Sequence, residues 1–182
     1  MDRRKRGTGL GPERTTEVQM KTPLRVARLA NLMLAGMLTG HEFAGFMAIY
    51  PALGKLPPLA RLQAEQAIYR RYGKIMPFYM SSTIASFLPT LTLIQKRKSP
   101  AFRFTLAGMT CFAAMLMVTL TKNLPINKRI EELPTEEASF EEFRELRERW
   151  DRLHAARNIL NVTGLVFSAL GALSHADTEK TT

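Results

Sequence analysis

Two ionisable residues stand side by side inside an apolar stretch of this sequence. His41 and Glu42 lie within residues 29–50, where almost every other side chain is apolar or small. An ionisable side chain at the centre of a membrane span costs about 2.5–3.5 kcal/mol on insertion scales, so the few that occur there usually have a function. His41 and Glu42 are therefore the first candidates for a functional site.

A second group of polar residues opens the last apolar stretch of the chain. Spacings of three and four residues place side chains on one face of a helix. The members of this face are Trp150, His154, Arg157, Asn158 and Asn161. An imidazole can act as a general base. The predicted catalytic residues are His41, Glu42, His154 and Arg157.

Structural explanations compete with the catalytic ones. His41 could simply form a hydrogen bond to a neighbouring helix, and Glu42 could be neutral or form a structural ion pair with Arg157. Adjacent helical positions point about 100° apart, so only one of His41 and Glu42 need face a pocket. Trp150 is as well explained by anchoring at a membrane surface as by lining a substrate site.

The histidines could also hold a metal. Imidazole is a common ligand, so His41 or His154 could bind haem iron, and two histidines with one glutamate could bind iron. The spacing matches no metal motif such as His-Glu-x-x-His, however. Two alternatives therefore stay open: the protein uses no cofactor, or it binds haem or iron. The lone Cys111 excludes a disulfide within the chain.

Four apolar blocks must position these residues. They cover about residues 24–50, 75–94, 101–121 and 153–173, each about long enough to cross a hydrocarbon core of about 30 Å as a helix. Ser139 and Glu142 form a capping-box pattern before the last block. The predicted fold is an all-α, integral membrane four-helix bundle whose long fourth helix extends out of the bilayer.

The bundle is predicted to occupy residues 24–175 as one domain, between a flexible basic tail (1–23) and a disordered tail (176–182). Within the linker 52–74, the second part is predicted to form a short helix at the membrane surface. Gly36 and Gly40 fit a close helix-packing face.

The net charge of +10 does not indicate nucleic-acid binding, because the basic residues flank the apolar blocks. Their density favours a multi-pass protein of the cell membrane with both termini in the cytoplasm. The lipid bilayer is the expected partner.

The four-span topology predicts where the polar residues meet. Residues 41–42, the turn predicted at Asn123–Asn127 and the start of the fourth span must all lie on one side of the membrane. A polar pocket is expected in that half of the bundle. Its predicted substrate-binding residues are Asn123, Asn127, Trp150 and Asn158.

Two short motifs resemble the anthrone-oxygenase-like family of small membrane proteins, in its bacterial branch. They are Asn-x-Pro-x-Asn at residues 123–127 and Trp-x-x-x-His-x-x-Arg at residues 150–157. The passage from Glu65–Gln66 to Pro77 is also similar, and the resemblance covers about residues 31–173. Some fungal members oxygenate anthrones to anthraquinones without a conventional cofactor, whereas most bacterial members have no assigned reaction.

The resemblance implies an oxygenase or oxidoreductase that acts on an aromatic or quinone-like lipophilic substrate. Cofactor-independent oxygenation would need a base, His154 or His41, to form a carbanion beside dioxygen. A monooxygenase that depends on haem or iron is the other enzymatic form. The alternative function is a non-catalytic accessory module that packs against a partner membrane protein.

Overall fold

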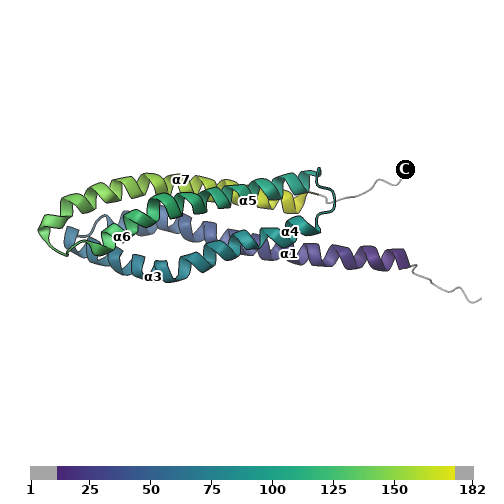
Figure 1. Ribbon diagram of the computed structural model, residues 1–182, viewed down its shortest axis with the longest axis horizontal. Coiled ribbons are helices and arrows are strands. Elements are labelled where there is room, and N and C mark those ends of the chain that lie inside the picture. Colours follow the sequence, from purple (N-terminus) through teal and green to yellow (C-terminus); the bar gives the residue numbers. More distant parts are fainter. Residues whose placement is uncertain (1–11, 175–182) are drawn as a thin grey trace, which may run out of the picture.

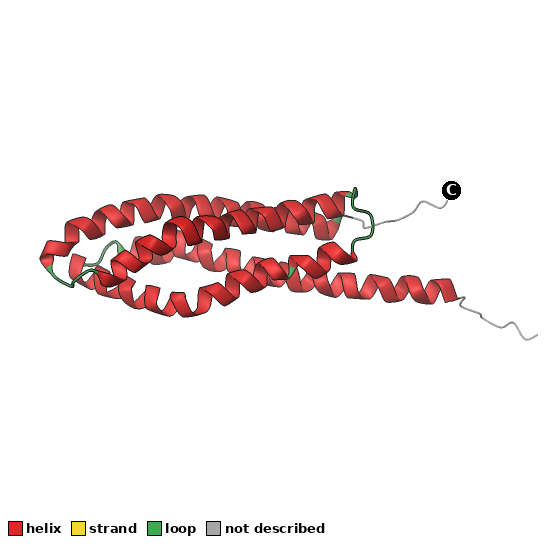
Figure 2. Ribbon diagram, in the orientation of Figure 1, coloured by secondary structure: helices red, strands yellow, loops and turns green. Residues whose placement is uncertain are grey.

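The structure, a computed structural model, describes residues 12–174, with side chains from residue 22 onward, and this part of the chain is all helical (Figures 1 and 2). The α-helices are α1 (Pro12–Ala44), α2 (Tyr50–Leu53), α3 (Pro58–Ala85), α4 (Phe87–Leu93), α5 (Pro100–Val118), α6 (Leu124–Glu132) and α7 (Phe140–Leu173). Two π-helical turns, η1 (Gly45–Ile49) and η2 (Thr119–Asn123), and one 3-10 turn, η3 (Glu137–Ser139), lie between them.

The turns join these helices into four long rods that run side by side (Figure 1). The π-helical turn η1 continues α1 into α2, and η2 continues α5 into α6 without a loop. The other two rods are α3 followed by α4, and α7 alone. The predicted all-α bundle of four helices is confirmed.

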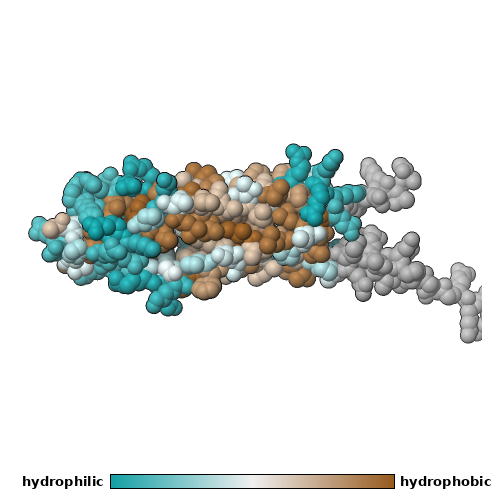
Figure 3. All heavy atoms as spheres, in the orientation of Figure 1, coloured by the Kyte–Doolittle hydropathy of each residue, from teal (hydrophilic) through white to brown (hydrophobic). Residues whose placement is uncertain are grey.

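The surface of the bundle carries an apolar band between two hydrophilic ends (Figure 3). Three stretches are long and apolar enough to cross a membrane: Thr22–Leu53, Pro100–Glu132 and Glu137–Leu173. Large apolar side chains are exposed on them, including Met37 (61%) and Ile159 (67%). Exposed apolar surface on this scale is typical of a protein that contacts lipid. The α3–α4 rod is not among the three stretches, so the four-span arrangement stays a prediction.

Close packing occurs between α5 and α7. A Cβ added at Gly108 would lie 3.0 Å from the carbonyl oxygen of Gly164, and one at Gly171 would lie 3.0 Å from the amide nitrogen of Thr105. Only glycine allows backbones to approach this closely. The predicted packing face at Gly36 and Gly40 is wrong, because a Cβ at either position would meet nothing within 4 Å.

The linker helix predicted at the membrane surface is the first part of α3. The side chains of Leu62, Glu65 and Tyr69 are buried there. Gln66 Nε2 donates to the carbonyl oxygens of Ile130 and Leu133, at 3.0 and 2.9 Å. These contacts hold the segment against the end of α6.

Three local predictions differ from the structure. The motif at Asn123–Asn127 is not a turn, because η2 and α6 are helical throughout it. The helix α7 begins directly after Ser139, as expected, but the Ser139 side chain forms no capping bond. Glu142 instead pairs with Arg129, whose Nε lies 2.5 Å from Oε1. The helix α1 begins at Pro12, inside the predicted tail, and residues 1–11 and 175–182 lie outside the described part.

Candidate active site

A cavity of about 140 Å³ lies between α1, α3, η2–α6 and α7. Its polar lining includes His41, Glu42, Asn127, Glu131, Trp150, His154 and Arg157. Its apolar lining includes Met76, Met80, Leu116 and Leu120. Both π-helical turns reach the cavity, through Gly45 and Thr119. Insertions of this kind in helices are frequent at functional sites.

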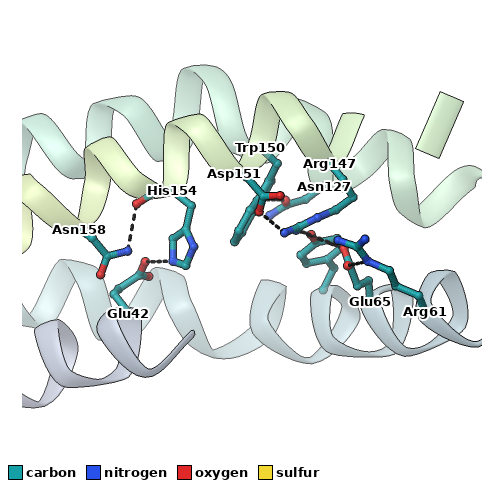
Figure 4. Close-up of polar contacts among 10 residues, drawn as sticks. Glu42, Arg61, Glu65, Asn127, Arg147, Trp150, Asp151, His154 and Asn158 are labelled. Carbon is teal, nitrogen blue, oxygen red and sulfur yellow. Dashed lines mark hydrogen bonds and ion pairs between the residues drawn. The ribbon is translucent and has the colours of Figure 1, made fainter. Parts of the chain in front are cut away.

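Glu42 connects α1 to two side chains of α7, those of His154 and Arg157. Arg157 Nη2 donates to Glu42 Oε1 at 2.5 Å, and His154 Nε2 lies 3.3 Å from Glu42 Oε2. Figure 4 shows the imidazole of His154 pointing at the Glu42 carboxylate. All three residues are at most 6% exposed. Glu42 and Arg157 therefore form a buried ion pair, and His154 lies beside it as the third member of a buried triad.

Aromatic rings surround His154. Its ring centroid lies 4.4 Å from that of Trp150, 5.4 Å from that of Tyr50 and 6.0 Å from that of Phe46. A Cβ at Gly45 would lie 3.4 Å from His154 Cε1, so the π-helical turn η1 approaches the imidazole closely. Such packing fixes the ring and removes water from it.

His41 faces a different side of the same cavity. It is half-buried, and its ring meets Tyr72 of α3 edge-to-face at a centroid distance of 5.1 Å. Glu42, the next residue, faces α7 instead. Both residues therefore line the cavity, from different sides, and they do not form one dyad.

The four predicted substrate-binding residues separate into two pairs. Trp150 and Asn127 line the cavity, where the indole Nε1 donates to Asn127 Oδ1 at 2.7 Å. Asn158 donates to the carbonyl oxygen of His154 at 3.0 Å, within its own helix. Asn123 is fully buried, and both of its amide atoms lack a hydrogen-bond partner. Neither of the last two is part of the cavity wall.

The comparison with protein families matches residues 66–167, more than half of the chain, to the family described as anthrone oxygenase. The chain belongs to the anthrone-oxygenase-like family. The matched region contains both motifs, so the predicted resemblance is confirmed. It covers Asn127, Trp150, His154 and Arg157, while His41 and Glu42 precede it. Neither the curated proteins nor the solved structures contain a match.

In this anthrone-oxygenase-like chain, a second buried ionic cluster was missed by sequence reasoning. Glu65 and Arg147 are 0% and 2% exposed, and Arg147 Nη1 lies 3.2 Å from Glu65 Oε2. Figure 4 shows this pair beyond Trp150, on the side away from Glu42. One signal was available, because Arg147 precedes His154 by seven residues and so lies on the same helical face.

Within residues 12–174, no group of three or more His, Cys, Asp or Glu side chains is arranged to hold a metal ion. The arrangement has other capabilities. His154 directs Nε2 at a carboxylate, which leaves Nδ1 as the nitrogen able to accept a proton. A carboxylate in this position orients an imidazole and stabilises its protonated form, as in the hydrolase triads.

Proposed function

We propose that this protein is an integral membrane oxygenase that oxidises an aromatic or quinone-like lipophile in the cavity described above. One observation carries the proposal: a buried Glu42–His154–Arg157 triad borders a cavity with aromatic and apolar walls, in a chain with membrane-compatible helices. Membership of the anthrone-oxygenase-like family supports the substrate class.

The proposed reaction converts an anthrone and dioxygen into an anthraquinone and water. His154 takes the proton from the methylene carbon opposite the ketone, which leaves a resonance-stabilised carbanion. The carbanion is oxidised as its carbon forms a bond to dioxygen. The resulting peroxide anion takes up a proton and becomes a hydroperoxide. Loss of water breaks the O–O bond and leaves the second ketone, so atoms and electrons balance.

Each part of the site has a role in this scheme. The Glu42 carboxylate lies 3.3 Å from His154 Nε2, where it holds the ring in place and stabilises the imidazolium without taking its proton. Arg157 keeps Glu42 ionised by pairing with it and adds positive charge near the carbanion. Dioxygen is apolar and partitions into the wall formed by Met76, Met80 and Leu116. His41 lines the same cavity beside Tyr72 and is the second candidate base.

The scheme uses dioxygen as oxidant and calls for no bound cofactor. A haem-dependent or iron-dependent reaction with His154 or His41 as ligand is the competing chemistry. An absorption spectrum and metal analysis of the purified protein distinguish the two. A Soret band or stoichiometric iron that is lost in His154→Ala or His41→Ala would replace the cofactor-free scheme.

The proposed setting is the cell membrane, crossed four times, with both termini in the cytoplasm. One end of the bundle supports this orientation, because six basic residues lie in the segments found there, the first half of α1 and the connection from α4 into the start of α5 (Figure 1). They are Arg25, Arg28, Lys96, Arg97, Lys98 and Arg103. Basic ends face the cytoplasm. In a Cys111→Ser background, Lys98→Cys should react with a membrane-impermeant maleimide only after the cells are opened.

The test of function is anthrone oxidation under ¹⁸O₂ by protein in lipid nanodiscs. Product should carry one ¹⁸O atom, and His154→Gln should lower turnover by about 10²–10⁴-fold, the usual contribution of a general base. Arg144→Lys, at an exposed position remote from the cavity, is the matched control and should keep full activity. Unchanged turnover in both His154→Gln and His41→Gln would overturn the mechanism.

A further inference from the structure

The second buried ionic cluster lies directly behind the aromatic wall of the cavity. Glu65 is its centre and receives three donors. Arg61 Nε lies 2.9 Å from Oε1, the Tyr69 hydroxyl donates to Oε2 at 3.1 Å, and Arg147 Nη1 lies 3.2 Å from Oε2. The same Nη1 also donates to the Tyr69 hydroxyl at 2.8 Å. Arg147 Nη2 pairs with Asp151. The Arg147 guanidinium is thus held through both of its terminal nitrogens, by Glu65 and Tyr69 at Nη1 and by Asp151 at Nη2.

The guanidinium supports two rings that line the cavity. Arg147 Cζ lies 4.2 Å from the ring centroid of Trp150 and 4.7 Å from that of Tyr50. A planar guanidinium stacks on aromatic faces in a way that a lysine ammonium does not. The Tyr50 and Trp150 rings also touch each other, at 4.6 Å between centroids. Arg147 therefore sets the position of the indole.

The indole in turn sets the orientation of Asn127. Trp150 Nε1 can only donate, and it lies 2.7 Å from Asn127 Oδ1. If the Asn127 amide were rotated by 180°, its NH₂ group would face the indole N–H. Both groups are donors, so no hydrogen bond could form. The oxygen of Asn127 must therefore face Trp150. The NH₂ group is left to donate elsewhere, and Asn127 lines the cavity.

We infer that the Asn127 NH₂ group is the subsite that binds a substrate carbonyl oxygen, and that Glu65 and Arg147 are positioning residues acting on it through Trp150. This rests on the proposed function and narrows its substrate class to flat aromatic molecules that carry an acceptor oxygen. Asn127 and His154 both line the cavity, so one bound molecule can contact both side chains. A ketone bound there becomes the enolate oxygen as His154 removes the proton.

The cluster fits a positioning role better than a purely stabilising one. A buried ion pair is commonly matched or exceeded in stability by apolar residues of the same volume. Its value lies in geometry, because several directed bonds hold one guanidinium plane in one place. That plane is what Trp150 and Tyr50 contact.

The test compares two ligands of the same shape, anthraquinone and anthracene, of which only the first carries carbonyl oxygens. Trp150 is the single tryptophan of the chain, so quenching of its emission reports binding at the cavity wall. In nanodiscs, the unaltered protein should prefer anthraquinone by about tenfold, the ratio that corresponds to one hydrogen bond. Asn127→Leu, which keeps the number and branching of the side-chain heavy atoms but removes the donor, should abolish the preference. Anthracene affinity should stay the same.

Arg147→Lys tests whether Arg147 positions Trp150. The lysine keeps a positive charge beside Glu65 but lacks the planar guanidinium that stacks on the Trp150 and Tyr50 rings. The substitution should lower the preference for anthraquinone severalfold, whereas the exposed control Arg144→Lys should leave it unchanged. The pH profile of anthrone turnover should keep its shape in Arg147→Lys, since His154 is untouched. Equal weakening of both ligands would show a merely structural role and overturn the inference.

The outcomes separate this inference from the proposed function. If the unaltered protein binds both ligands equally well yet oxidises anthrone through His154, the inference fails and the function stands. If it binds neither ligand and turns over no anthrone, both fail. Should Arg147→Lys not fold, Asn127→Leu decides alone, because Asn127 is outside the ionic cluster and only half-buried.

Discussion

The guanidinium of Arg157 donates to the carboxylate of Glu42 at 2.5 Å, although 115 residues separate the two in sequence. This bond joins α1 to α7 inside the apolar band. Both side chains are about 95% buried. If one of them is removed, water cannot reach the charge of the other to solvate it. The pair is therefore both a structural link and the electrostatic support of His154.

Removal of one partner from this pair should be costly. Arg157→Leu leaves Glu42 buried without its cation and is expected to lower the free energy of unfolding by about 3–5 kcal/mol. The double variant Glu42→Leu/Arg157→Leu should recover most of that loss, because no unpaired charge remains. Thermal unfolding in nanodiscs measures both. A double variant that is no more stable than Arg157→Leu would contradict the argument.

The matched control is an exposed pair on the same helix. Arg144 and Glu141 lie 2.5 Å apart but are 66% and 67% exposed. Arg144→Leu should leave the unfolding temperature unchanged, because water solvates the remaining carboxylate.

The parts of the site that were predictable are those marked by polar residues inside apolar stretches. Glu42, His154 and Arg157 stand out because charge is expensive at membrane depth. The alternating direction of the predicted spans then placed these three residues in the same half of the bundle. The pairing of Glu42 with Arg157 was one of several alternatives, since sequence cannot show which face of α1 turns inward.

Other parts carried no usable signal. Glu65 and Arg147 lie in charged segments, where most charges are solvated, so their burial depends on contacts with α6 and Tyr50 that only the fold creates. Gly36 and Gly40 have the spacing of a packing motif, but the close approach is at Gly108 and Gly171. Which glycines face a neighbour is decided by helix rotation, and spacing alone does not determine it.

Tyr69 should make the protein sensitive to high pH. Burial raises the pKa of Tyr69 well above its usual value, although Arg147 opposes this. In the unfolded chain the phenol titrates near pH 10. A group whose pKa is raised on folding contributes stability that is present below its unfolded pKa and is lost as pH rises. The unfolding temperature should therefore fall above about pH 10. Each protein is compared with its own unfolding temperature at pH 8, and the fall should be smaller in Tyr69→Phe. An equal fall in both proteins would contradict the prediction.

Close packing of α5 against α7 should make Gly108 intolerant of a side chain. A Cβ at this position would lie 2.9 Å from Ser168 Oγ and 3.0 Å from the carbonyl oxygen of Gly164, which is backbone and cannot rotate away. Gly108→Ala is expected to destabilise by about 1–3 kcal/mol, as overpacked sites do. Gly36→Ala, which meets nothing, should be neutral or stabilising by its better helix propensity. Similar unfolding temperatures for the two variants would show that the helices are not in close contact at Gly108.

Trp150 should report the protonation of His154 directly. The two ring centroids lie 4.4 Å apart, and the chain has no other tryptophan. An imidazolium accepts an electron from an excited indole, whereas a neutral imidazole does so poorly, so emission should fall when His154 takes up a proton. The fall should disappear in His154→Gln and persist in His41→Gln, whose ring contacts Tyr72 instead. If His154 is the base, turnover of anthrone should decline over the same pH interval as the emission. Emission that still falls with pH in His154→Gln would assign the quenching to another group and remove this link between the triad and the aromatic wall.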